Sequence, residues 1–70
     1  IMPTYSQKVG VRIREMRVEC SYTQSTIAAI LGITQEQYSR YEAGIATLTI
    51  LHIALLAAWY KCDYNRILAV

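Results

Sequence analysis

Four polar residues in the middle of the chain carry side chains that can pair with the edges of DNA bases. They are Gln35, Glu36, Ser39 and Arg40, at relative positions i, i+1, i+4 and i+5. Glutamine pairs with adenine in two places, arginine pairs with guanine in two places, and glutamate accepts from cytosine. On a helix, these positions share one outward strip. The strip is a candidate base-contacting surface, although any solvated helix surface is also polar and that alternative stays open.

The strip lies on a short helix predicted between Thr34 and Gly44. The threonine can cap the first turn, and the glycine can end the helix in a left-handed conformation. Tyr38 and Tyr41, three residues apart, are predicted to face inward. A helix this short gains its stability from packing, so its inward positions must be apolar and its other positions are free to be polar.

A second short helix is predicted just before it, between Thr23 and Gly32. Its inward residues are Ile27, Ala28 and Leu31. Its start, at Thr23 and Gln24, offers unpaired backbone N–H groups and a positive dipole end, which suit a phosphate. A tight turn at Gly32 and Ile33 then leads into the polar helix. This order predicts a helix-turn-helix over residues 23–44, in which the first helix crosses the DNA backbone and the second lies in the groove.

Three further helices complete an all-α bundle of about five short helices. Thr4 and Gln7 form a capping box for a helix that ends near Cys20, Thr49 can cap a helix over residues 50–60, and Asp63 can cap a last short helix. The apolar face of the first comprises Val9, Ile13, Met16 and Cys20, and that of the fourth comprises Ile50, Ile53, Leu56, Ala57 and Tyr60. No useful strand pattern is present, and we expect one domain over residues 2–70, with Met2 as the natural start.

The composition of the chain limits the classes of function that it can have. The 70 residues carry a net charge of +2, with 54% apolar and 17% charged residues. This balance is compatible with nucleic acid without demanding it. The two cysteines lack metal-ligand spacing and are expected to be reduced thiols in a cytoplasmic protein. The apolar run over residues 50–60 is roughly half as long as a membrane-spanning helix.

The chain offers no constellation that indicates catalysis. No activated nucleophile, pair of acids or glycine-rich phosphate loop is visible, so we expect no enzyme activity. His52 stands alone, and a surface or interface histidine is more common than a lone metal ligand. We therefore expect no metal, no cofactor and no small-molecule ligand.

The stretch "TQSTIAAILGITQEQYSRYEAG" resembles the helix-turn-helix of phage lambda repressor and Cro type proteins, the Xre family. The resemblance extends to "VGVRIREMR" in the first helix and to the apolar frame of the last two, so it covers nearly the whole chain. It implies a compact bundle of about five helices that binds double-stranded DNA.

The resemblance also implies roles for particular residues. Gln24 is expected to hold a phosphate and brace Gln35, and Arg17 and Glu42 are expected to form a structural salt bridge; the alternative is that Arg17 binds DNA. The resemblance matches Gln35, Glu36 and Arg40 to base-contacting positions and Gln37 or Ser39 to backbone contacts. With the outward strip, the start of the second helix and the loop after Gly44 added, the expected base contacts are Gln35, Glu36, Ser39 and Arg40, and the expected phosphate contacts are Thr23, Gln24, Gln37 and Thr47.

Two turns depart from the family pattern. Glycine is usual where Ser21 stands and asparagine where Ala43 stands, so these corners can be built differently. The loop "IATLT" after Gly44 lacks the lysine or arginine that often faces phosphates there. Its contacts are then limited to backbone N–H groups and the hydroxyls of Thr47 and Thr49. Modest affinity for one half-site is expected, and a dimer would raise it.

The helix over residues 50–60 has more apolar residues than its inner face needs. Leu51, Leu55, Ala58 and Trp59 form a second stripe. A monomer rarely leaves such a patch in water, so we expect a homodimer interface at Leu51, Leu55 and Trp59. Complete burial of this helix is the alternative. The "TLTI" entry is similar to restriction-modification controller proteins, one subtype among several.

These observations predict a sequence-specific transcriptional regulator, a repressor or autoregulator, that binds a near-palindromic operator as a dimer. Two alternatives stay open. One is the antitoxin of a toxin–antitoxin pair, whose apolar stripe meets a toxin. The other is a protein-interaction module that has the same fold without contacting DNA bases.

Overall fold

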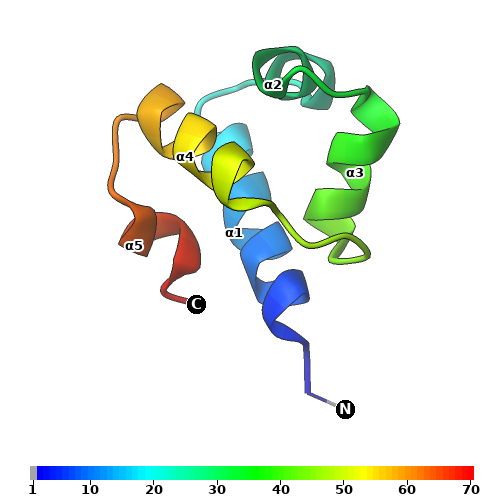
Figure 1. Cartoon of the computed structure of the whole chain (residues 1–70), viewed down its shortest axis with the longest axis vertical. Coiled ribbons are helices and arrows are strands. Elements are labelled where there is room, and N and C mark those ends of the chain that lie inside the picture. Colours follow the sequence, from blue (N-terminus) through cyan, green and yellow to red (C-terminus); the bar gives the residue numbers. More distant parts are fainter. Residues whose placement is uncertain (1) are drawn as a thin grey trace.

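Five helices follow one another in the computed structural model, which describes residues 2–70 (Figure 1). They are α1 (Tyr5–Glu19), α2 (Gln24–Leu31), α3 (Gln35–Ala43), α4 (Ile50–Trp59) and α5 (Tyr64–Leu68). Residues 2–70 contain no strand, which confirms the predicted all-α class. Within the same residues, no helix is long and apolar enough to cross a membrane, and no group of three or more His, Cys, Asp or Glu residues is placed to hold a metal.

Each helix begins at the predicted cap. The side chain of the capping residue accepts a hydrogen bond from the backbone N–H three residues later in every case. The caps are Thr4, Thr23, Thr34, Thr49 and Asp63. Gln7 also accepts from the Thr4 backbone N–H, which completes the predicted capping box. Since each such cap contributes roughly 1 kcal/mol, the five together decide where these short helices start.

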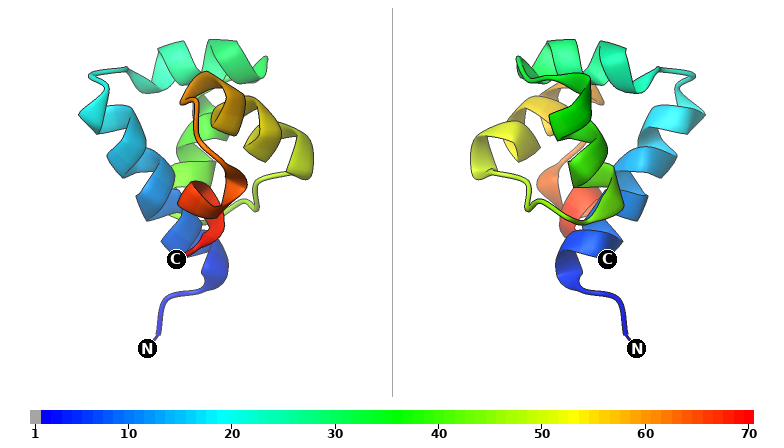
Figure 2. Two further views of the ribbon diagram at one scale, coloured as in Figure 1. Left: turned by 90° about the vertical axis from the view of Figure 1, so that its left-hand side faces the viewer. Right: turned by 90° about the vertical axis from the view of Figure 1, so that its right-hand side faces the viewer.

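The core lies where the helices meet. Helix α1 packs against α3 and α5, and α2 packs against α3 and α4. Five side chains are completely buried: Ile13, Ile27, Tyr38, Leu56 and Ile67. Helix α2 lies across the end of the bundle opposite the N-terminus, and α3 and α5 lie on opposite sides of the molecule (Figures 1 and 2). Helix α3 is therefore held at the side of the bundle, with one of its faces free.

A glycine lets α1 and α3 touch through their backbones. A Cβ atom at Gly10 would lie 2.4 Å from the carbonyl oxygen of Glu42 and 2.6 Å from that of Tyr41. No side chain fits at that distance, so Gly10 sets how closely the C-terminal half of α3 approaches α1. No pattern in the sequence indicates this role for Gly10.

Two residues that were predicted to face inward are exposed. Cys20 is the C-cap of α1 and is exposed, because the chain leaves the helix there through Ser21. Ile50 is 87% exposed. It is the first residue of α4, where the helix has not yet reached the core, and Leu48 in the preceding loop is buried in its place.

Ser21 adopts the left-handed conformation that glycine usually supplies. Its φ is 60°, and the Tyr22 backbone N–H donates to the Arg17 carbonyl at 3.1 Å. The turn after α1 is thus built in the left-handed form despite the serine, at the steric cost of a Cβ atom in that region.

Candidate nucleic-acid interface

A left-handed glycine joins α2 to α3. Gly32 has φ 71° and ψ 28°, and the Ile33 backbone N–H donates to the Ala28 carbonyl at 3.0 Å. This is the hydrogen-bonded helix end that a left-handed residue permits. The half-buried Ile33 then packs against the core. The turn fixes the direction in which α3 leaves α2.

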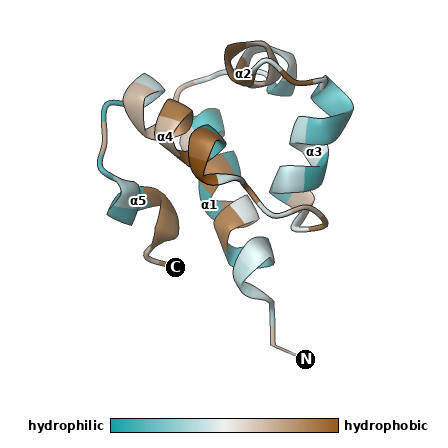
Figure 3. Ribbon diagram, viewed as in Figure 1, coloured by the Kyte–Doolittle hydropathy of each residue, from teal (hydrophilic) through white to brown (hydrophobic). Residues whose placement is uncertain are grey.

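Helix α3 divides into a buried face and a free face. Tyr38 is 0% and Tyr41 4% exposed, whereas Gln35, Glu36 and Arg40 are exposed. Gln37 and Ser39 are half-buried. The hydropathy colouring shows that α3 is mainly hydrophilic, whereas α4 is mainly hydrophobic (Figure 3). The candidate base-contacting strip is therefore accessible.

Neighbouring side chains orient the strip. Arg40 Nη2 lies 2.9 Å from Glu36 Oε1, one helical turn away. The Ser25 hydroxyl donates to Gln35 Oε1 at 2.8 Å. Gln24, which was expected to brace Gln35, instead donates from Nε2 to Glu42 Oε1 at 3.2 Å. Ser25 takes the bracing position because it lies one residue further along α2 and its short hydroxyl reaches the amide.

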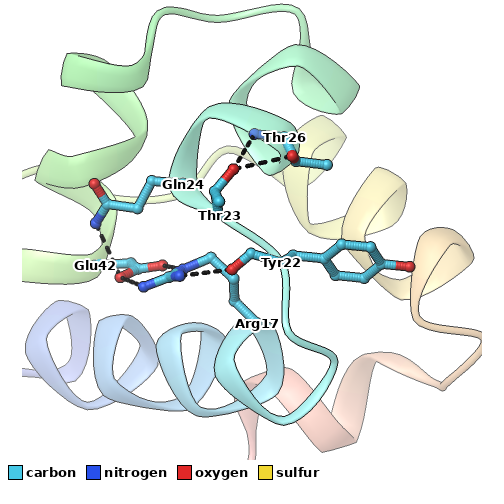
Figure 4. Close-up of polar contacts among 6 residues, drawn as sticks. All are labelled: Arg17, Tyr22, Thr23, Gln24, Thr26 and Glu42. Carbon is cyan, nitrogen blue, oxygen red and sulfur yellow. Dashed lines mark hydrogen bonds and ion pairs between the residues drawn. The ribbon is translucent and has the colours of Figure 1, made fainter.

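An ion pair behind the strip ties α1 to α3 and to the turn that follows α1 (Figure 4). Arg17 of α1 donates from Nε to Glu42 Oε2 at 2.7 Å and from Nη2 to Glu42 Oε1 at 3.2 Å. Its Nη1 donates to the Tyr22 carbonyl at 2.8 Å. The two side chains are only 14% and 6% exposed. Since all three guanidinium nitrogens have partners within the protein, Arg17 holds α1, the following turn and α3 in place.

These contacts set the charge states of the network. Burial alone would raise the pKa of Glu42, but hydrogen bonds from Arg17 and Gln24 outweigh it and the pKa is lowered. The bond to Glu42 raises the pKa of Arg17. Burial, then the Glu42 carboxylate, raises the pKa of Tyr38. Glu42 and Arg17 are therefore both charged at neutral pH.

The hydroxyls of the remaining phosphate candidates already have partners. Thr23 Oγ1 lies 3.0 Å from Thr26 Oγ1 and also caps α2, and Thr47 Oγ1 lies 3.0 Å from Ser6 Oγ. A hydroxyl has one proton and two lone pairs, so each retains capacity for a further bond. Both threonines are exposed.

The geometry of residues 23–44 is thus a helix, a left-handed turn and a helix with a free polar face. The helix-turn-helix family model HTH_3 matches residues 13–66. The chain belongs to this HTH_3 family. The match confirms the resemblance to lambda repressor and Cro type proteins, and the family assignment makes the chain a DNA-binding, helix-turn-helix transcription regulator. No curated protein and no solved structure matches the chain.

Two features of the HTH_3 chain were not among the sequence-based predictions. The Ser25–Gln35 contact depends on how the turn aims the two helices, and no residue spacing indicates it. No role was predicted for Arg14 of α1 either. Arg14 and Arg17 are three residues apart, a spacing that places both on one side of a helix. That spacing was the available signal.

Proposed function

We propose that this HTH_3 protein regulates transcription by occupying a near-palindromic operator as a homodimer, with α3 in the major groove. The observation that carries the proposal is the exposed polar strip held on the buried Tyr38 and Tyr41. A strip positioned in this way is preorganised for contact with base edges. Occupying an operator blocks transcription or limits the protein's own synthesis, so a repressor or autoregulator is the proposed role.

Residues of the strip would contact bases, and residues around the strip would contact phosphates. The base contacts are Gln35, Glu36, Ser39 and Arg40, and the phosphate contacts are Thr23, Gln24, Gln37 and Thr47. The Glu36–Arg40 ion pair would not prevent contact with bases, because both side chains are more than half exposed and such a pair contributes at most about 1 kcal/mol to stability. DNA can therefore replace it.

Arg40→Ala should weaken operator binding by about 1 to 3 kcal/mol and relax the preference at one base position per half-site. A bidentate contact to guanine would be lost, while contacts to phosphates would remain. The measurement is selection from a random pool of duplexes, followed by titration of the recovered sequence.

Arg66→Ala is the matched control. Arg66 is also an exposed arginine paired with a glutamate, at 3.4 Å from Glu19, but it lies on α5, away from α3. It should leave the selected sequence unchanged. Unaltered affinity and base preference in the Arg40 variant would contradict a base-contacting role for this residue.

The exposed face of α4 supports the proposed dimer. Leu51 is 66%, Leu55 37% and Trp59 43% exposed, and they recur every four residues along the helix. Contiguous apolar surface of this kind marks interaction sites. In such a dimer the two α3 helices would enter successive major grooves about 34 Å apart.

Leu51→Glu should convert a dimer into a monomer, because a carboxylate would be buried at the two-fold axis without a partner. Sedimentation velocity measures the change. Val11→Glu places the same charge on an exposed valine of α1 and should leave the dimer intact. If the unmodified chain is itself monomeric and co-purifies with a second protein, the α4 face serves a different partner, as in an antitoxin.

A further inference from the structure

A polar hollow between α1, α2 and α3 includes one cation, Arg14, to which no role has been given so far. It is lined by Arg14, Arg17, Gln24, Ser39, Glu42 and Ala43. We propose that this hollow holds a phosphate of the DNA backbone and that Arg14 is the cation that binds it. The inference rests on the proposed function, since it adds a backbone contact to the same interface.

The charges in the hollow leave one cation unbalanced. Glu42 is the carboxylate among the lining residues, and Arg17 already neutralises it through two hydrogen bonds. Arg14 is exposed, and within residues 2–70 it forms no ion pair. The hollow therefore carries one positive charge, on the exposed side chain of Arg14, that none of its other lining residues pairs with. A guanidinium matches the geometry of a phosphate and can bind two of its oxygens.

The hollow borders the surface that would face DNA. Ser39 belongs to the base-contacting strip, and Gln24 is the first residue of α2. A phosphate beside Arg14 would thus lie next to the groove that α3 enters. The Ser39 hydroxyl and the second amide hydrogen of Gln24, beyond the one bonded to Glu42, are further donors there.

Other cations of α1 point elsewhere. Arg12 donates from Nη1 to the Arg66 carbonyl of α5. Lys8 lies next to Val70 at the C-terminal end of the chain, in a hollow that also includes Pro3 and Arg12. Of these three cations, Arg14 is the one that faces α3.

The test compares Arg14→Gln with Lys8→Gln, each of which removes one cation from α1 and lowers the net charge from +2 to +1. Affinity is measured for the selected operator and for an unrelated duplex over a range of salt concentrations. Arg14→Gln should weaken binding to both duplexes by a similar factor, roughly tenfold for a dimer, and lower the log–log salt slope by about 0.9 per protomer. Lys8→Gln should change neither slope nor affinity, and Arg14→Lys should retain most of the slope because the charge is kept.

The outcomes separate this inference from the proposed function. Equal affinity and slope in the Arg14→Gln and Lys8→Gln variants, while Arg40→Ala still loses operator affinity, would overturn the phosphate site and leave the regulator standing. Absence of any specific duplex binding by the unmodified protein would overturn both. A thermal melt of each variant excludes loss of fold, which is not expected because both side chains are exposed.

Discussion

Gly10→Ala is expected to destabilise the protein severely, with a loss of more than about 4 kcal/mol in the free energy of unfolding. The added Cβ atom would meet two backbone carbonyl oxygens of α3 at 2.4 and 2.6 Å. Neither oxygen can rotate away, so α1 and α3 would have to separate. Because a domain of this size is stable by only about 5 to 10 kcal/mol, that separation removes much of its margin. Urea denaturation followed by circular dichroism measures the loss.

The sign of this effect makes the test decisive. Helix propensity alone predicts that alanine stabilises an interior helical position by about 1 kcal/mol relative to glycine. The close packing of α1 on α3 at Gly10 predicts a larger effect of opposite sign, a loss of stability. A variant of unchanged or increased stability would show that α1 and α3 do not meet at Gly10.

Gly32→Ala is the control for the same substitution without the contact. Nothing lies within 4 Å of a Cβ atom built at Gly32, and its φ of 71° is the single source of strain. The expected loss is about 1 to 2 kcal/mol. The difference between the two glycines isolates the approach of α1 to α3 from backbone conformation.

The helix boundaries were predictable because their signals are local. Thr23, Thr34 and Thr49 each precede an apolar period and can cap it, and Gly32 and Gly44 each follow one. These residues act within a single turn of their own helix, so sequence spacing is sufficient to find them. The polar strip of α3 was predictable for the same reason, since Tyr38 and Tyr41 fix its opposite face.

Features that depend on two or more helices were not predictable. The closeness of Gly10 to Glu42 depends on how the turns at Ser21 and Gly32 aim α1 and α3. The inward assignment of Ile50 was wrong because periodicity gives the face of a helix and not how far its first turn extends beyond the core. The Arg14 hollow requires three helices to meet, which spacing along one of them does not reveal.

Arg17→Met is expected to cost about 3 to 5 kcal/mol, the second largest effect. Methionine keeps most of the side-chain volume but leaves the Glu42 carboxylate, 6% exposed, without its cation. Gln24 would remain as a single donor at 3.2 Å. Desolvation of an uncompensated charge, rather than loss of packing, causes the effect, so it should depend on pH.

The pH dependence has a definite direction. In the unmodified protein the pKa of Glu42 is lowered below 4.5. The stability that its carboxylate contributes is therefore fully present above pH 4.5 and is lost as the pH falls through the lower pKa of the folded state. In the Arg17→Met variant, burial would dominate and raise the pKa of Glu42. The variant should therefore take up a proton at a higher pH, and its deficit relative to the unmodified protein should shrink as the pH falls from neutral towards 4.

The double variant Arg17→Met, Glu42→Leu distinguishes buried charge from lost packing. Removing both partners leaves no charge to desolvate, so it should be more stable at neutral pH than Arg17→Met alone, since apolar replacement of a buried pair is often close to neutral. Urea unfolding at neutral and acidic pH measures both differences. Equal stability of the single and double variants at both pH values would mean that water reaches the pair. In that case the close approach at Gly10 alone would hold α3 against α1. The contacts of Arg17 with Glu42 and the Tyr22 carbonyl would contribute little.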